Sequence, residues 1–180
     1  RNILVDNVST DYFILLDDDF IIDQFSNINK GLELLIANDL DIVGGRCIDL
    51  IDNERDLKER SFIGNMEKRA NALHLETIKP TSNLMLCDFV MNFFIAKTVS
   101  VKSLRWDDEL KILEHIEFFF RAKEVGLKVG FSPLFYTFHK PKSNKEYVKY
   151  RRGQVDKYSK LLMEKLGMQQ IFLDGTLSKG

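Results

Sequence analysis

The sequence predicts an α/β fold in which a mixed, mostly parallel sheet is flanked by helices. Short apolar runs typical of strands occur at residues 12–16, 41–48 and 127–138. Residues 24–38 and 114–125 instead repeat apolar side chains at the helical spacing of three and four residues. Strands that alternate with helices favour parallel pairing, because a crossover helix returns the chain to the same edge of the sheet.

The first strand is predicted at residues 12–16, which read Y-F-I-L-L. An amphipathic helix is predicted at residues 24–38, because its apolar positions follow the i, i+3, i+4, i+7 pattern. These positions are Phe25, Ile28, Leu32, Leu35 and Ile36. Residues 41–48 form a strand interrupted by Gly44 and Gly45, where a β-bulge or the close approach of a ligand would require glycine. The charge-rich residues 52–60 are expected to form a loop or a short helix.

Further strands are predicted at residues 70–78 and 84–96, separated by a turn-prone segment. Thr98–Leu104 is expected to be a short helix, and the helix at 114–125 is expected to end at Gly126 as its cap. Residues 127–138 form either a strand pair or one long strand broken at Pro133. Lys145–Leu166 is predicted to be a basic amphipathic helix that ends at Gly167.

Composition favours one globular domain with a sizeable core, since the 180 residues are 44% hydrophobic and 29% charged. The net charge of −1 provides no electrostatic basis for binding nucleic acid or an acidic membrane surface. Cys47 and Cys87 lie in apolar runs and are interpreted as buried thiols, with a bridge between them as the alternative. No apolar stretch reaches the roughly 18 residues of a membrane-spanning helix.

Three consecutive carboxylates, Asp17, Asp18 and Asp19, follow the first predicted strand. Carboxylates at the end of a buried strand lose favourable hydration unless a cation meets them there. Mg2+ and Mn2+ take oxygen ligands, and ligands of open α/β sheets bind at the carboxyl ends of strands. The triplet therefore predicts a divalent metal site, with a solvated turn before the next helix as the alternative.

The order of the elements resembles the GT-A fold of nucleotide-sugar glycosyltransferases over residues 1–140. The motifs that carry this resemblance are R-N at residues 1–2, Y-x-x-x-x-D-x-D at 12–19, V-G-G at 43–45, N-F-F-x-A-K-T at 92–98 and H-x-E-F-F at 115–119. Among enzymes of this fold, the last three motifs are most similar to the β-1,4-N-acetylgalactosaminyltransferases. The resemblance implies a Rossmann-like sheet whose N-terminal strands lie upstream of this chain.

The resemblance implies a metal site made by Asp17, Asp19 and His139, with Mn2+ or Mg2+ as the cofactor. Asp19 matches the direct ligand, and Asp17 matches the aspartate that faces the ribose or a metal-bound water. The implied donor is a UDP-sugar, whose departing diphosphate the cation would neutralise. Asp17, Asp18 and Lys140 are expected to contact the donor nucleotide, although strand alternation turns Asp18 to the opposite side. The alternatives are an exposed histidine in a basic tail for His139 and a solvated loop for Lys140.

An inverting transferase needs a base that removes the proton of the acceptor hydroxyl. In the enzymes that this chain resembles, an acidic pair at the start of a helix is used, and the matching stretch here contains Glu114, His115 and Glu117. His115 stands where many of those enzymes carry aspartate, so all three residues are candidate catalytic groups. The spacing places Glu114 and Glu117 on one helical face with His115 rotated away. Acids that stabilise the helix N-terminus are the alternative interpretation.

The expected contacts with the donor sugar or the acceptor are Asp88, Asn92, Trp106, Asp107, Gly44 and Gly45. Asp88 and Asn92 are polar positions in an apolar run, so each needs a partner if it is buried. A hydrogen bond within the core would also satisfy them. Trp106 would stack on a sugar face or pack in the core.

These observations predict a metal-dependent, inverting glycosyltransferase that moves N-acetylgalactosamine or another hexosamine from a UDP-sugar to a glycan or glycolipid hydroxyl. Residues 1–140 are expected to form the catalytic core, and residues 141–180 a basic helix and tail. The alternatives are an inactive carbohydrate-binding or scaffold domain of the same fold, and a metal-dependent phosphatase or nucleotidyltransferase. Nucleic acid is not an expected partner.

The chain begins at Arg1 and soon reaches a strand, which we interpret as a fragment of a longer protein. Membrane contact is therefore expected only through sequence that lies outside this chain. A eukaryotic parent would be anchored in the Golgi, and a bacterial parent would be cytoplasmic or membrane-associated.

Overall fold

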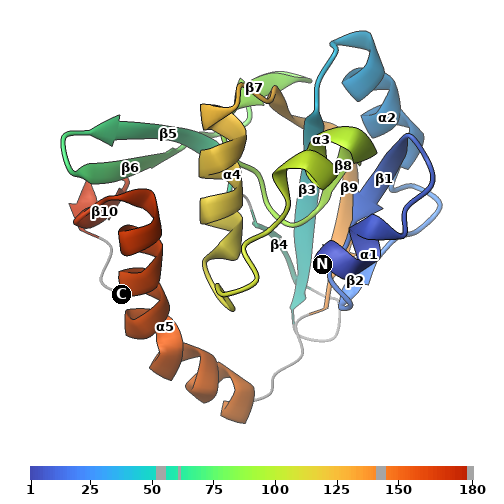
Figure 1. Ribbon diagram of the computed structural model, residues 1–180. Coiled ribbons are helices and arrows are strands. Elements are labelled where there is room, and N and C mark those ends of the chain that lie inside the picture. Colours follow the sequence, from blue (N-terminus) through green and yellow to red (C-terminus); the bar gives the residue numbers. More distant parts are fainter. Residues whose placement is uncertain (52–55, 61, 141–144, 178–180) are drawn as a thin grey trace.

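The computed structural model describes residues 1–51, 56–60, 62–140 and 145–177 (Figure 1). The helices are α1 (Asn2–Asp6), α2 (Ile28–Ala37), α3 (Thr98–Leu104), α4 (Glu114–Glu124) and α5 (Lys145–Leu166). The strands are β1 (Tyr12–Leu15), β2 (Phe20–Ile21), β3 (Ile42–Ile51), β4 (Asp56–Arg60), β5 (Gly64–Arg69), β6 (Ala72–Thr77), β7 (Met85–Cys87), β8 (Phe94–Lys97), β9 (Val129–His139), β10 (Gln170–Leu173) and β11 (Thr176–Leu177).

The central sheet runs β1-β8-β3-β9-β2, with β4 paired to β3 and β7 paired to β9. Helices cover both of its faces (Figure 1). Along β3, Ile42 belongs to the hydrophobic cluster that contains α4, whereas Val43 belongs to the cluster that contains α2. Neighbouring residues of a strand point to opposite faces, so α2 and α4 lie on opposite sides of the sheet.

The sheet is mixed, as expected, but the expectation of mostly parallel pairing is wrong. In the described part of this sheet only β3 and β9 pair in parallel, and all other pairs are antiparallel. Parallel neighbours need a long crossover, usually through a helix. The strands β4 to β8 instead follow one another with no helix between them in the described residues.

The predicted helices are found close to their expected positions. α3 and α5 have the predicted bounds, and α4 ends one residue earlier than predicted. α2 starts only after Asn27, whose φ is 54°, so Phe25 lies outside the helix and is 66% exposed. Gly126 and Gly167 follow α4 and α5 with φ of 77° and 63°, the left-handed conformation that ends helices.

The strand predictions fail where a buried loop resembles a strand. The predicted strand at 84–96 is two short strands, β7 and β8, joined by irregular residues in which Phe89, Val90 and Phe93 are fully buried. An apolar run signals burial, but it does not distinguish a strand from a buried connection. β9 is one long strand rather than a strand pair, and its pairing with β3 is interrupted between Phe131 and Tyr136, around Pro133. Residues 56–60 form β4 rather than a loop or short helix, and residues 52–55 lie outside the described residues.

A second sheet has the order β11-β10-β6-β5, in which β10 runs parallel to β6. Asp174 and Gly175 form the turn between β10 and β11 with φ of 49° and 75°, as in a type I′ hairpin. The Asp174 carboxylate also accepts a hydrogen bond of 2.7 Å from the Thr77 backbone N–H. The residues after α5 are therefore tied to β6, while the division of the chain at residue 140 stays a prediction.

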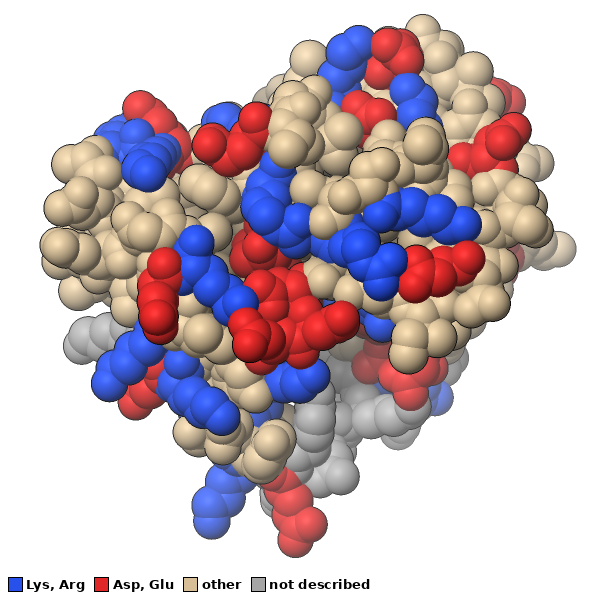
Figure 2. Space-filling view, viewed as in Figure 1, with Lys and Arg blue, Asp and Glu red and all other residues tan. Residues whose placement is uncertain are grey.

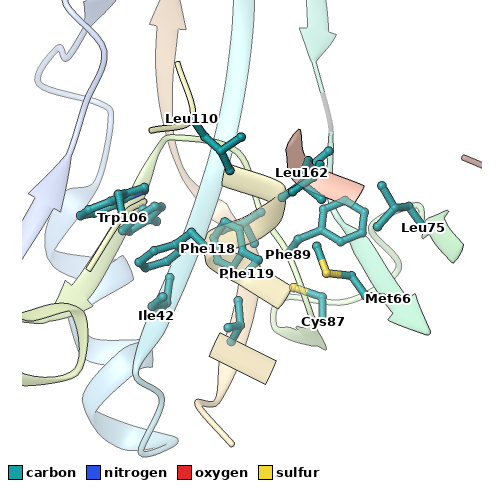
Figure 3. Packing of buried hydrophobic residues seen from close by; sticks show 14 of the residues in the cluster. Ile42, Met66, Leu75, Cys87, Phe89, Trp106, Leu110, Phe118, Phe119 and Leu162 are labelled. Atoms are coloured by element: carbon teal, nitrogen blue, oxygen red, sulfur yellow. The ribbon is translucent and has the colours of Figure 1, made fainter. Parts of the chain in front are cut away.

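The larger hydrophobic core joins α4 and α5 to both sheets (Figure 3). Phe118 of α4 stacks on Trp106 with ring centroids 4.5 Å apart and planes 12° apart. Cys47 and Cys87 are free and buried, which confirms the thiol interpretation. Burial raises the pKa of both thiols to about 12, and the charge of Asp49 adds to the effect at Cys47.

The surface mixes acidic and basic side chains on the face that Figure 2 shows, as the net charge of −1 leads one to expect. Within the described part of the chain, no helix combines the length and the apolar character needed to cross a bilayer.

Gly44 and Gly45 lie at a register shift of the β3–β9 pair, so the predicted irregularity is present, but the extra residues lie in β9, because Gly44 pairs with Phe131 and Arg46 with Tyr136. A Cβ atom on Gly45 would lie 2.4 Å from Phe93 and 2.6 Å from Phe135. A Cβ atom on Gly44 would lie 2.6 Å from Val90. Both glycines are buried, and these core side chains occupy the space that a ligand would need to reach them.

Gly45→Ala is expected to destabilise the protein by about 1–3 kcal/mol, because the added methyl group overpacks two aromatic rings. Urea unfolding followed by circular dichroism measures this change. Gly153→Ala is the matched control, because Gly153 lies in α5 with nothing within 4 Å of an added Cβ atom. That control should be neutral or slightly stabilising. Equal unfolding midpoints for Gly45→Ala and the parent would reopen the ligand-contact interpretation of this glycine.

Candidate functional site

A cavity of about 710 Å³ opens beside the end of β1 and the start of α4. Six of the residues that the sequence singled out border it: Asp17, Asp18, Asp19, Asn92, Glu114 and His115. They come from three separate segments of the chain. The fold therefore brings the acidic triplet and the start of α4 to one place, as the predicted site requires.

The acidic triplet belongs to the turn between β1 and β2. The Phe20 backbone N–H donates to the Asp17 carbonyl at 3.2 Å, which closes this turn. Burial raises the pKa of Asp17, the Arg1 guanidinium 3.8 Å away opposes this rise, and the charge of Asp19 adds to it. A further cation at this place would relieve the repulsion between the carboxylates and favour their ionised forms.

His139 meets the triplet at the edge of the sheet. As the last residue of β9 it pairs with Phe20 of β2, and the Lys140 N–H donates to the Asp19 carbonyl at 3.1 Å. These contacts hold His139 Nε2 3.2 Å from Asp19 Oδ2, although 120 residues separate them in sequence. His139 is only 6% exposed, so it is not an exposed histidine of a basic tail.

Asp49 is a polar residue of this region that the sequence did not single out. Its Oδ1 lies 2.7 Å from His139 Nδ1, and its Oδ2 accepts hydrogen bonds from the Arg60 guanidinium at 3.1 and 3.2 Å. Asp49, Cys47 and His139 offer ligand atoms within 4.8 Å of one another. The pairing of β3 with β9 creates this cluster, and no local spacing in the sequence predicts it.

The groups around Asp19 fit a hard divalent cation. Carboxylate oxygens suit Mg2+ and Mn2+, and an imidazole nitrogen favours the transition metal of the two. The 3.2 Å between Asp19 Oδ2 and His139 Nε2 is close to the spacing of about 3 Å between neighbouring ligands of an octahedral ion with bonds of about 2.1 Å. Asn92 Oδ1, at the border of the cavity, is buried and has no hydrogen-bond partner among the described residues. Such an atom is usually satisfied by a ligand or by water.

The start of α4 presents Glu114 and His115 to the cavity. Glu114 forms an ion pair with Arg1, and its side chain is 15% exposed. His115 is half-buried with its ring edge-on to Phe62 at 5.7 Å. Burial lowers the pKa of His115, and the charge of Glu114 opposes this effect. The surroundings of His115 therefore disfavour its charged imidazolium form.

Glu114 and Glu117 lie one turn apart in α4, as the spacing predicts, but of the three candidate bases only Glu114 and His115 border the cavity. The cavity lies at the N-terminal end of α4, so the first two side chains both reach it, whereas Glu117 lies one turn further along. Glu117 is 4% exposed and accepts a hydrogen bond of 2.8 Å from Arg121. Arg121 also donates to the Leu104 and Arg105 carbonyls at 2.6 and 2.7 Å, so this pair fastens α4 to the end of α3.

Asp88 and Asp107 have partners within the fold and do not border the cavity. The Asp88 carboxylate accepts hydrogen bonds of 2.7 Å from the Met66 backbone N–H and from Lys123 Nζ. Asp107 lies 2.8 Å from Lys165 Nζ and links α5 to the loop before α4. For Asp88 this is the core-hydrogen-bond alternative, and no sugar contact is required to satisfy either carboxylate.

Trp106 is a core residue in this structure. It is 6% exposed and stacked on Phe118. Asn2 holds its backbone, donating to the Trp106 carbonyl at 2.8 Å and accepting from its N–H at 2.9 Å. The Trp106 ring is therefore occupied by packing, and Asn2 of the R-N motif has a structural role.

The sequence missed several side chains of the cavity: Arg1, Arg60, Phe62, Met91, Lys111 and Arg151. The four cations come from four distant parts of the chain without a common spacing, so no pattern could have predicted them as a group. Lys140 has an exposed side chain that does not border the cavity among the described residues. Lys142, a second lysine close to it in the sequence, lies outside the described residues.

No protein-family model matches the chain. Relatives are found among glycosyltransferases: the β-1,4 N-acetylgalactosaminyltransferase 1 of Rattus norvegicus is 29% identical over 126 residues, and that of Homo sapiens is 27% identical over the same length. The β-1,4 N-acetylgalactosaminyltransferase 2 of Mus musculus is 28% identical over 124 residues. Each match covers 66% of this chain, and the chain spans about a quarter of the length of these relatives (24%, 24% and 23%).

This similarity supports a glycosyltransferase relationship and, at the level of the family, a transferase. The mixed α/β architecture with mixed sheets is compatible with it. Transferases of this kind bind a sugar donor and a glycan acceptor.

Proposed function

We propose that this chain carries the metal and donor site of an inverting glycosyltransferase. It transfers N-acetylgalactosamine or another hexosamine from a UDP-sugar to a glycan hydroxyl, with Mn2+ or Mg2+ as cofactor. The observation that supports this proposal most strongly is the 3.2 Å approach of His139 Nε2 to Asp19 Oδ2, beside a cavity that also contains Asp17 and Glu114.

Different residues around the cavity bind different parts of the donor in this proposal. Asp19 and His139 would hold the cation, which would supply positive charge opposite the diphosphate leaving group. Arg60, Lys111 and Arg151 border the same cavity and supply further positive charge toward the phosphates. Asn92 offers its unpaired Oδ1 to a hydroxyl or amide group of the donor.

Glu114 is the base in this proposal. Its carboxylate borders the cavity and accepts the proton of the attacking hydroxyl. His115 is less suited to this role, because its buried surroundings disfavour the imidazolium form that proton acceptance would create.

The proposal is tested by incubating the protein with a panel of nucleotide sugars and glycan acceptors, with Mn2+, with Mg2+ and with a chelator. We expect sugar transfer from one UDP-sugar, release of UDP, loss of transfer with the chelator, and an inverted anomeric configuration in the product by proton NMR. Nucleotide and metal binding without turnover would favour the inactive carbohydrate-binding or scaffold domain. Release of phosphate or pyrophosphate without transfer would favour a phosphatase or nucleotidyltransferase.

A further inference from the structure

We propose that Asp49 is the positioning residue of the metal site: it holds His139 so that Nε2 faces the cation beside Asp19. This inference rests on the proposed function, because it takes Asp19 and His139 as metal ligands. Asp49 is a buried carboxylate that belongs neither to the acidic triplet, nor to the start of α4, nor to any motif of the sequence. The inference gives this carboxylate a role.

The sheet itself holds Asp49 beside His139. The two residues are register partners in the parallel β3–β9 pair, and both are nearly inaccessible, with exposed fractions of 8% and 6%. The Asp49 Oδ1 to His139 Nδ1 distance of 2.7 Å is that of a strong, charge-assisted hydrogen bond. The ring edge of His139 also packs against Phe20, with centroids 5.5 Å apart, so the imidazole has little freedom to turn.

This contact determines which ring nitrogen faces Asp19. With the Nδ1 hydrogen donated to the Asp49 carboxylate, a ring that binds a cation offers its lone pair at Nε2. That lone pair lies 3.2 Å from the Asp19 carboxylate. At this distance the contact between Nε2 and the Asp19 carboxylate is favourable with either a proton on Nε2 or a cation between them. Metal-binding histidines characteristically donate their second ring N–H to a carboxylate in this way.

Arg60 fixes the second oxygen of Asp49. Its Nε and Nη2 donate to Oδ2 at 3.2 and 3.1 Å, from a position opposite Cys47 in the β3–β4 ladder. Both carboxylate oxygens of Asp49 are therefore engaged by protein groups. Asp49 therefore orients His139 and does not itself bind the cation. For the same reason, the cluster of Cys47, Asp49 and His139 is not a second metal site.

Mn2+ binding provides a test that does not depend on catalysis. Titration of the chain with Mn2+, followed by electron paramagnetic resonance, gives the affinity, and electron spin echo modulation detects an imidazole nitrogen bound to the ion. The parent is expected to bind Mn2+ with nitrogen coupling, and His139→Ala is expected to lose that coupling. Asp49→Ala should bind Mn2+ at least about tenfold more weakly and lose the nitrogen coupling. Asp49→Asn should recover part of the coupling, because its one amide oxygen can accept the Nδ1 hydrogen bond, although its amide nitrogen cannot replace the oxygen that faces Arg60.

Glu59→Gln is the matched control for lost charge. Glu59 lies on β4 and pairs with Arg46, so its replacement removes one negative charge near the same strands without touching His139. It should bind Mn2+ as the parent does. If circular dichroism shows that Asp49→Ala does not fold, Asp49→Leu, which fills the space with an apolar side chain, is read by the same criteria.

The outcomes separate the two proposals. Failure of the parent to bind Mn2+ contradicts the proposed metal site. Binding by the parent, together with unchanged nitrogen coupling in Asp49→Ala or Asp49→Leu, overturns the role of Asp49 and leaves the proposed function in place. A merely structural role of Asp49 would lower the unfolding midpoint without removing the nitrogen coupling.

Discussion

Asp19→Ala is expected to abolish Mn2+-dependent binding of UDP and, with it, sugar transfer. The variant removes the carboxylate that lies 3.2 Å from His139 Nε2. The affinity for UDP in the presence of Mn2+ should fall by more than about 100-fold. Loss of a residue that only orients a metal ligand already lowers metal affinity by about 10–100-fold, and Asp19 is a direct ligand in the proposal. The fold should persist, since the side chain is 22% exposed and its removal relieves repulsion within the triplet.

Isothermal titration of UDP with and without Mn2+ measures this effect, and thermal unfolding monitors the fold. Asp11→Asn is the matched control, because Asp11 precedes β1 at the opposite end of the same strand and is exposed. It should bind UDP and Mn2+ as the parent does. Retention of metal-dependent binding by a folded Asp19→Ala variant would show that the cation binds elsewhere.

Glu114→Gln is expected to lower kcat by about 100-fold to 10,000-fold, the contribution of a well-placed general base. The amide keeps the size of the side chain and its place beside Arg1, but it cannot accept the proton of the acceptor hydroxyl. The dissociation constants for UDP and Mn2+ should change little by comparison. The loss should therefore appear in kcat rather than in donor binding.

Steady-state kinetics of Glu114→Gln, His115→Gln and Glu124→Gln distinguish the candidate bases. Glu124 ends α4 and is exposed, so its variant controls for the loss of a glutamate from the same helix. A large loss of kcat in His115→Gln together with near-parental kcat in Glu114→Gln would assign the base to His115 instead.

The sequence identified the helices well because each has its own periodicity and end signal. α3 and α5 were predicted at their observed bounds, and Gly126 and Gly167 take the left-handed φ expected after a helix. The sheet was harder to predict, because pairing depends on partners far away in the chain. The direction of β8 beside β3 and the irregular path through Phe89 and Phe93 are decided by packing, which no local pattern records.

The candidate site was predictable where chemistry is concentrated in consecutive residues. Asp17 to Asp19 could be selected because charged residues next to an apolar run require an explanation, whereas Glu114 was indicated only by the resemblance of its stretch to glycosyltransferases. Asp49 could not be selected, because only its pairing opposite His139 in the sheet indicates a role at the site. Asp88 and Trp106 were candidate ligand contacts, because one is a polar residue in an apolar run and the other an aromatic residue that could stack on a sugar. In the fold, Lys123 pairs with Asp88 and Phe118 stacks on Trp106.

The central claim is that a divalent cation binds between the turn after β1 and the end of β9. Crystals soaked with Mn2+ and UDP test it most directly, through the anomalous scattering of manganese. We expect a manganese peak within about 2.5 Å of both Asp19 Oδ2 and His139 Nε2, with the UDP diphosphate beside it in the cavity. A manganese peak elsewhere in the molecule, with no density between Asp19 and His139, would contradict it.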